Sequence, residues 1–182
     1  MVRFGARSGS LALAILAGFL TAPVGVEAVT ANLSNTLDAH IDALGELSVP
    51  ASSSLTHSGT LFNAFTGTVT VQYLARTTAA GGGNITMQVT QDFQTGGPSV
   101  VSGDLTYVCG TAGLGTACGS STASTSTATS VVTLPTSACT GGGSPCSATN
   151  PNTVIVTFSL ADRPVVKTGS FTANIQFTIS AT

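Results

Sequence analysis

The chain has 182 residues, of which 42% are hydrophobic and 7% charged, and its formal net charge is -2. Nucleic-acid binding needs clustered Lys and Arg, and this chain holds five in total, so its composition excludes that class of partner. Few charges and no Trp also argue against a cytosolic enzyme, and the length suits one domain with a real core.

Residues 1–28 have the pattern of a cleaved signal peptide. Arg3 and Arg7 give a positive start, residues 11–20 (LALAILAGFL) are apolar, and small residues stand before the expected cleavage point. The apolar run is interrupted before it reaches the roughly 20 residues that a membrane span needs. We therefore expect export, a mature single domain of residues 29–182, and no membrane span after cleavage.

Residues 29–50 fit two patterns. Apolar residues recur at helical spacing between positions 33 and 44, yet they also alternate with polar residues between positions 37 and 43. We favour a strand, because Gly45 and Pro50 punctuate the segment and the rest of the chain has strand patterns.

Alternating apolar and polar residues predict a series of strands along the middle of the chain. They cover residues 68–76 (TVTVQYLAR), 84–90 (NITMQVT), 105–109 and 153–160 (TVIVTFSL), with a short apolar run at 131–134. The glycines at 81–83 permit positive φ, so the linker after residue 76 is expected to close a hairpin. The low-complexity residues 119–130 (GSSTASTSTATS) form either an exposed loop or a Thr-rich edge strand.

Four cysteines in a chain that we expect to be exported predict two disulfides. Three connectivities are possible. We favour Cys109–Cys118 and Cys139–Cys146, because the partners are close in sequence and bracket Gly-rich loops. The alternative, a zinc site, has the wrong cysteine spacing and no neighbouring His.

Residues 171–182 (FTANIQFTISAT) show the most regular alternation in the chain. Four large apolar residues share one face of the expected strand: Phe171, Ile175, Phe177 and Ile179. Full burial of each would stabilise the fold by roughly 1.5–3 kcal/mol. Together that is comparable with the net stability of a typical domain, so we expect this strand to be essential to the core.

Several short strands, Gly and Pro turns, and no convincing long helix predict an all-β fold. We expect an antiparallel immunoglobulin-like β-sandwich of roughly seven to nine strands. The rival, an outer-membrane barrel, needs aromatic girdles, which two Tyr and no Trp cannot supply.

The sequence contains few groups that could carry chemistry. On a strand, Asp38, His40 and Asp42 would share one face and could bind a metal, but a solvated polar face is the better interpretation. His57 lies in a turn-like context, where we expect it to be exposed. No Gly-x-Ser-x-Gly nucleophile elbow occurs, so we expect neither an enzyme nor a cofactor.

The closing segment 169–179 (GSFTANIQFTI) is similar to the Gly-Thr-Tyr-x-x-x-Val-x-Val-Thr-Val pattern in the last strand of spore-coat-U-type pilin subunits. More broadly, the mature chain resembles secreted bacterial Ig-like surface proteins. The resemblance implies a structural role outside the cell. It further implies that an incomplete sandwich exposes an apolar groove, which the N-terminal strand of a partner fills. Val29, Ala31 and Leu33 alternate at the mature N-terminus and could be such a donor, although the chain's own first strand is the better interpretation.

Together these observations favour a non-enzymatic, extracellular or cell-surface structural or adhesion protein, of the kind that builds a pilus or surface filament. Its partners would be copies of itself or other surface proteins, joined by strand pairing. The alternative is a secreted carbohydrate-binding module. Polar loops fit that alternative, but the chain offers few aromatic residues for stacking on sugars.

Overall fold

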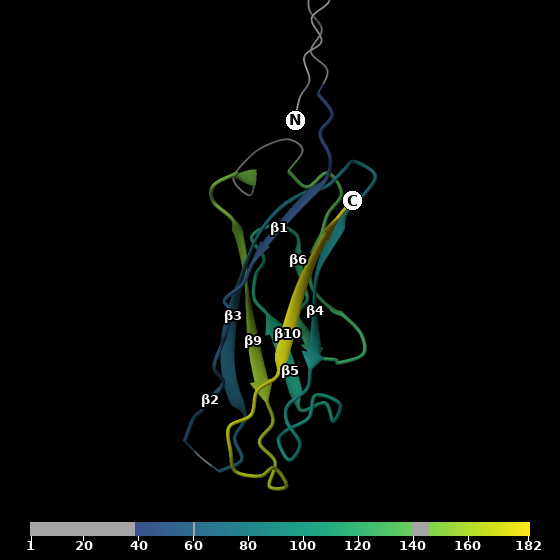
Figure 1. The fold of residues 1–182 in the computed structure, drawn as a ribbon. Helices are drawn as coiled ribbons and strands as arrows, with labels where there is room; N and C mark the ends of the chain where they lie inside the picture. Colours follow the sequence, from purple (N-terminus) through teal and green to yellow (C-terminus); the bar gives the residue numbers. More distant parts are fainter. Residues whose placement is uncertain (1–38, 60, 140–145) are drawn as a thin grey trace, which may run out of the picture. The chain divides into compact units, whose positions relative to one another are not determined.

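A computed structural model of the chain describes residues 39–59, 61–139 and 146–182. Backbone contacts divide the chain into residues 1–39 and 40–182, and both sheets belong to the second unit. The described residues form strands and connecting loops, and the predicted all-β antiparallel sandwich is confirmed (Figure 1).

Ten strands follow one another in the described residues, of which two, β2 and β6, are two residues long. Their bounds are β1 Leu44–Ser48, β2 Thr56–His57, β3 Phe65–Arg76, β4 Gly83–Gln91, β5 Leu105–Cys109, β6 Thr116–Ala117, β7 Ser120–Thr122, β8 Thr129–Leu134, β9 Asn152–Leu160 and β10 Asn174–Ala181. The five stretches with the clearest alternation all form strands, within three residues of the expected ends.

The strands form two antiparallel sheets. Sheet A has the order β1-β3-β9-β5-β7, with β2 also paired to β3, and sheet B has the order β10-β4-β8-β6. The low-complexity stretch 119–130 divides between the two expected structures, because it contains the edge strand β7 and a loop before β8.

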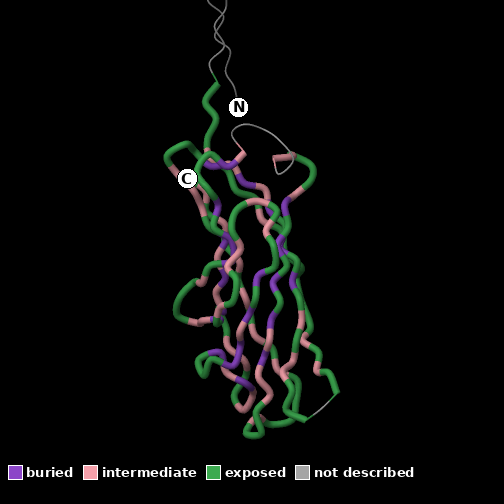
Figure 2. Tube along the Cα trace, turned by 180° about the vertical axis from the view of Figure 1, so that it is seen from behind, coloured by how far each residue is buried: buried purple, intermediate pink, exposed green. Residues whose placement is uncertain are grey.

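The core lies between the sheets, and buried residues alternate along the central strands (Figure 2). Its largest fully buried side chains come from β3, β4, β5, β8 and β9: Tyr73, Tyr107, Ile85, Met87, Leu105, Val71, Val89, Val131, Val132, Val154 and Val156. The long strands β3, β4 and β9 alternate between an inward apolar face and an outward face rich in Thr, Ser and Gln, as period-two alternation requires.

The predicted hairpin between β3 and β4 is wrong. β3 lies in sheet A and β4 in sheet B, so residues 77–82 cross from one sheet to the other. The crossing is fixed by Thr77, which is 1% exposed; its backbone N–H donates to Ala138 O at 3.1 Å and its hydroxyl to Pro135 O at 2.7 Å. Glycine in a linker indicates a turn but does not determine which sheet the next strand joins.

The closing strand also differs from the expectation. β10 begins at Asn174, and Phe171 lies before it with its ring against Gly97, where an added Cβ would stand 2.5 Å from the ring. Ile175, Phe177 and Ile179 pack on the core but stay half-exposed, because β10 is at the edge of sheet B. The expected full burial of these residues is therefore wrong.

Candidate functional site

One long side of the sandwich is incompletely closed, and we call it the open side. Its borders are β10, at the edge of sheet B, and β1 with the neighbouring edge of β3 in sheet A. Within the described residues, β10 pairs with β4 alone, so its other edge has no strand partner. A strand edge with free N–H and C=O groups is a template for pairing with another strand.

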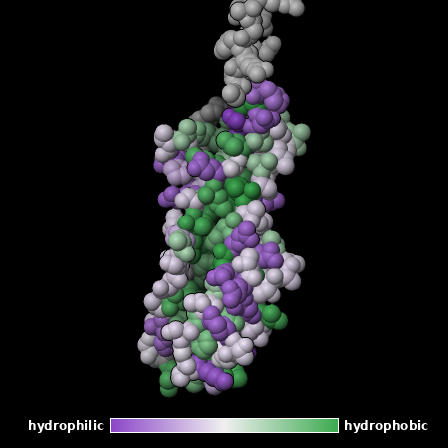
Figure 3. Space-filling model, viewed as in Figure 1, coloured by the Kyte–Doolittle hydropathy of each residue, from purple (hydrophilic) through white to green (hydrophobic). Residues whose placement is uncertain are grey.

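Apolar side chains gather along the open side. Ile175, Phe177 and Ile179 alternate along β10 and are half-buried against the core. Figure 3 shows a hollowed apolar stripe on this face, between β10 and the strands of sheet A. The stripe offers a further strand both a backbone edge and an apolar surface.

β1 covers a part of this side. It pairs with residues 72–76 of β3, and Gly45 lies so close to Ile179 that an added Cβ would stand 3.1 Å from that side chain. The contact is therefore near the C-terminal end of β10, and a bulkier residue than Gly45 would separate the two strands.

The middle of the β3 edge has no strand partner in the described part of the chain. β1 pairs with residues 72–76 and β2 with Phe65 and Thr66, which leaves residues 67–71 between them. The preceding segment crosses here without pairing: Ser53 Oγ donates to Thr68 O at 3.1 Å, and a Cβ on Gly67 would stand 2.5 Å from Ser54 O. The gap in sheet A lies on the same side as the free edge of β10.

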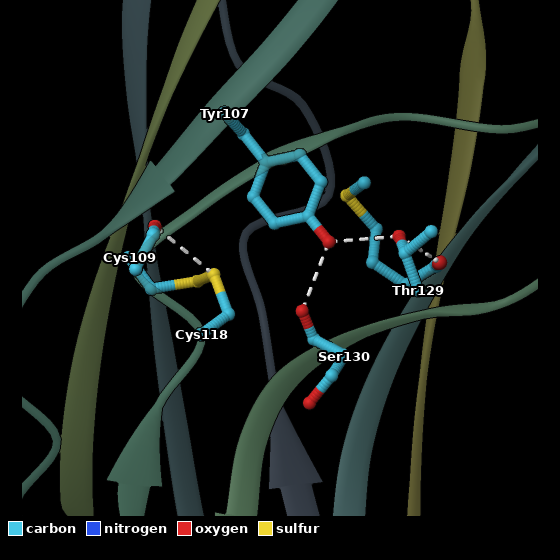
Figure 4. Close-up of a disulfide and its surroundings, with 7 residues drawn as sticks. Tyr107, Cys109, Cys118, Thr129 and Ser130 are labelled. Carbon is cyan, nitrogen blue, oxygen red and sulfur yellow. Dashed lines mark hydrogen bonds between the residues drawn. A yellow bond between two sulfur atoms is a disulfide. The ribbon is translucent and has the colours of Figure 1, made fainter.

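The opposite long side, which we call the closed side, is joined covalently. There the chain alternates between the sheets from β5 to β8, and the Cys109–Cys118 disulfide spans a Cα–Cα distance of 5.5 Å. Tyr107 is fully buried beside it (Figure 4), and its hydroxyl bonds Thr129 Oγ1 at 2.7 Å and Ser130 O at 2.9 Å across the two sheets.

Both predicted disulfides are present with the pairing that we favoured. Cys139–Cys146 lies at the far end of β3 and has a Cα–Cα distance of 5.1 Å. Two shallow hollows of about 340 Å³ each lie between β1, β3 and residues 146–151; they share Glu46, Leu74 and Ala148. Both hollows are lined in part by residues of β1.

The residues proposed for strand donation and assembly are only partly brought together. Ile175, Phe177 and Ile179 line the open side, whereas Phe171 covers the 92–104 loop. Val29, Ala31 and Leu33 lie outside the described residues. Sequence reasoning missed the unpaired edge of β3, and Gly67, which allows the close approach of Ser54, is the one local signal that could have found it.

The candidate metal-binding row is not assembled in the described residues. Asp38 lies outside them; His40 and Asp42 precede β1 and contact each other at 2.9 Å with side chains 89% and 80% exposed. No group of three or more His, Cys, Asp or Glu in the described ranges could hold a metal ion.

His57 is not in a turn, contrary to expectation. It lies on β2, is half-buried, and its ring centroid is 5.1 Å from that of Phe65. Its Nε2 is buried and has no hydrogen-bond partner among the described residues. His57 pairs with Phe65 at the start of β3, so it packs at that end of sheet A.

Two ionisable groups have clearly shifted pKa values, and both are structural. Burial raises the pKa of Tyr73, against the opposing effect of its 2.5 Å hydrogen bond to Leu114 O. Burial also acts to raise the pKa of Asp92, but hydrogen bonds, led by that from Val100 N–H, outweigh it and lower the pKa.

Comparison with known proteins identifies no relative. No protein-family model, no curated protein and no solved structure matches the chain. Function therefore has to be inferred from the surface of the fold itself.

Proposed function

We propose that this protein is a non-enzymatic extracellular structural or adhesion protein, and that its open side pairs with a strand of another subunit, as in a pilus or surface filament. The observation that carries the proposal is the free edge of β10 beside a half-exposed apolar row of Ile175, Phe177 and Ile179. A partner strand would extend sheet B and bury that row.

The edge carries little of the usual protection against pairing. Natural edge strands are kept apart by Lys, by Pro, by very short length or by bulges. β10 is eight residues long (NIQFTISA), has no charged residue and no Pro, and its one irregularity lies at its start, between Asn174 and Ile175. The free edge of β10 is therefore suited to pairing with another strand.

The donor in this proposal is the start of the mature chain. Val29, Ala31 and Leu33 alternate with polar residues, so one face of that segment would enter the apolar stripe. The signal-peptide pattern of residues 1–28 and the two disulfides support export to an oxidising compartment. None of the described residues belongs to a helix with the length and apolarity of a membrane span.

A carbohydrate-binding role has less support. Sugar sites use aromatic rings that are open to solvent, and Tyr73 and Tyr107 are 1% and 0% exposed with their hydroxyls bonded inside the fold. Among the phenylalanines in the described ranges, Phe62 alone is exposed, at 53%.

The test is size-exclusion chromatography of the exported protein, of a variant lacking residues 29–35, and of a Phe177→Ser variant. Each variant loses one half of the contact and should elute as a monomer, whereas the unaltered protein should elute as oligomers. Mixing the two variants should restore one contact and give a dimer, because one supplies the groove and the other the donor.

A matched control replaces Thr30, Asn32 and Ser34, the other face of the donor, with Ala and should assemble normally. If the unaltered protein and every variant elute as monomers over a wide range of concentrations, assembly by strand pairing is wrong.

A further inference from the structure

Three loops at one end of the sandwich carry exposed apolar side chains. Leu61 and Phe62, between β2 and β3, are 87% and 53% exposed; Val101, in the 92–104 loop, is 78% exposed; Val165, in the 161–173 loop, is 82% exposed. We call the described residues of these loops the loop end. Single exposed apolar residues are ordinary on a protein surface, but four in three adjacent loops are not.

The register of sheet A places these loops side by side. Leu160, the last residue of β9, pairs with Phe65 at the start of β3 and with Leu105 at the start of β5. All three loops therefore leave the sheet at the same row, at the bottom of Figure 1, and Figure 3 shows apolar side chains at the rim of this end.

Two of the loops hold each other rigidly. Lys167 N–H donates to Gly96 O at 2.9 Å, Thr172 N–H donates to Gln94 Oε1 at 2.8 Å, and Gln94 Nε2 donates to Thr172 Oγ1 at 2.7 Å. Val101 and Val165 thus project from a fixed frame, so little conformational entropy is lost when they are buried.

The third loop holds its apolar tip on a strained backbone. Phe62 has φ of 61°, in the left-handed region that a bulky residue rarely adopts. Such strain persists where it serves a function or is compensated nearby. The strained residue is Phe62 itself, which is exposed directly after the exposed Leu61.

Two acids of the loop end are bonded within it, and of these Asp104 is the buried one. Asp104 is 5% exposed and paired with Arg163 at 2.5 Å, and Asp92 accepts hydrogen bonds from Val100 N–H and Ser99 Oγ. Lys167 is exposed, and no ion pair involves it within the described residues.

Two acids remain partly at the surface. Asp92 and Asp162 are both half-exposed, and Asp162 stands next to Arg163 in the sequence. The outward charges are therefore Asp92, Asp162 and the outer part of Arg163, which stands before Val165, together with Lys167, which stands after it. A cationic residue thus lies near Val165 on each side, because residues 163–167 have the sequence Arg-Pro-Val-Val-Lys.

We propose that the loop end binds the interface of a lipid bilayer, with the four apolar side chains among the acyl chains and Lys167 at anionic headgroups. A protein partner needs a continuous, complementary patch, whereas these tips are separated by polar loop residues. A fluid interface accepts separate side chains, and a cation beside an apolar tip favours anionic lipid. This binding goes beyond the proposed strand pairing and does not depend on it.

The test is flotation of the exported protein with vesicles of phosphatidylcholine, with and without phosphatidylglycerol. The Leu61→Ser/Phe62→Ser and Val101→Ser/Val165→Ser variants should each bind vesicles at least about tenfold more weakly, since each loses two apolar side chains. The matched control is Val108→Ser/Ile155→Ser, which removes apolar residues that are 51% and 50% exposed on the outer face of sheet A; its binding should change less than about twofold.

Lys167→Gln should abolish the preference for phosphatidylglycerol, whereas Arg76→Gln, at the opposite end of β3, should leave it unchanged. Near-ultraviolet circular dichroism checks that each variant is folded, and monomeric fractions exclude effects of assembly. The proposal is overturned if the unaltered protein does not float, or if the sheet-face variant loses as much binding as the loop-end variants.

Discussion

The two long sides of the sandwich enclose the same core and are built in opposite ways. On the closed side the chain passes back and forth between the sheets from β5 to β8, with the Cys109–Cys118 disulfide and the buried Tyr107. On the open side β10 and β1 meet at Gly45 and Ile179, and the apolar side chains stay half-exposed. Covalent and buried contacts are thus concentrated on one side, and half-exposed apolar side chains on the other.

The largest expected effect is a difference in the free energy of unfolding between variants of one aromatic residue on each side. Tyr107→Ala should lower the free energy of unfolding by about 3–5 kcal/mol, because Tyr107 is fully buried. Phe177→Ala should lower it by about 1–2 kcal/mol, because its ring is half-exposed. Urea unfolding of both variants measures the difference, and equal losses would contradict the contrast between the sides.

Next in size is the loss of the closed-side disulfide. A Cys109→Ser/Cys118→Ser variant should be less stable by about 2–3 kcal/mol, since the short cross-linked loop no longer restrains the unfolded chain. The same variant should keep its oligomeric state in size-exclusion chromatography. A loss of assembly with retained folding would show that the closed side also takes part in binding.

The hydroxyl of Tyr107 should contribute less than its ring. Tyr107→Phe removes hydrogen bonds to Thr129 Oγ1 and Ser130 O and should destabilise the fold by about 1–2 kcal/mol, mainly by leaving buried acceptors unpaired. Thermal unfolding measures it. A neutral result would mean that water replaces the hydroxyl and that the closed side is less tightly packed than its burial suggests.

A charge on the edge of β10 should affect binding far more than stability. Thr178→Lys places a cation on the exposed face of the edge strand and should change the free energy of unfolding by less than about 0.5 kcal/mol. It should nevertheless suppress oligomers, as Lys does on natural edges. The isosteric control Thr178→Val should retain assembly.

The smallest expected effect concerns the loop end, where acid should remove the contribution of Asp92 to the free energy of unfolding. Because the folded pKa of Asp92 is lowered from 3.8, its ionised form stabilises the fold above that value, and this contribution disappears as the pH falls through the folded pKa. Asp92→Asn should therefore be less stable than the unaltered protein at neutral pH and equally stable in strong acid. Unfolding measured as a function of pH tests the sign, and a difference that grows in acid would contradict it.

The alternation of side chains was sufficient to predict the sandwich and the strands β3, β4, β5, β9 and β10, but not the two-residue strands β2 and β6. Period-two patterns depend on local geometry alone, which is why residues 68–76, 84–90 and 153–160 were assigned correctly. The pairing of strands depends on which apolar faces meet, and β3 and β4 face each other across the core instead of forming a hairpin. Gly81 and its neighbours carry no information about that choice.

The same limit explains what was missed at the candidate site. An apolar row such as Ile175, Phe177 and Ile179 looks the same in sequence whether its strand is central or at an edge. The place of β10 at the edge of sheet B follows from pairing with β4 alone, which is far from it in the chain. The short-range disulfides were predictable, because each joins cysteines that are close in sequence.

The register of the central strands has a consequence for the order in which the molecule acquires its structure. Phe65 pairs with Leu160 and Gly83 with Ala181. Neither sheet can therefore form until segments that are separated by most of the domain have come together. Topologies dominated by such distant pairings fold slowly, on the order of milliseconds to seconds. The Cys109–Cys118 loop, by contrast, can close as soon as its own residues meet an oxidant, so a locally cross-linked turn is available as a nucleus before either sheet is complete.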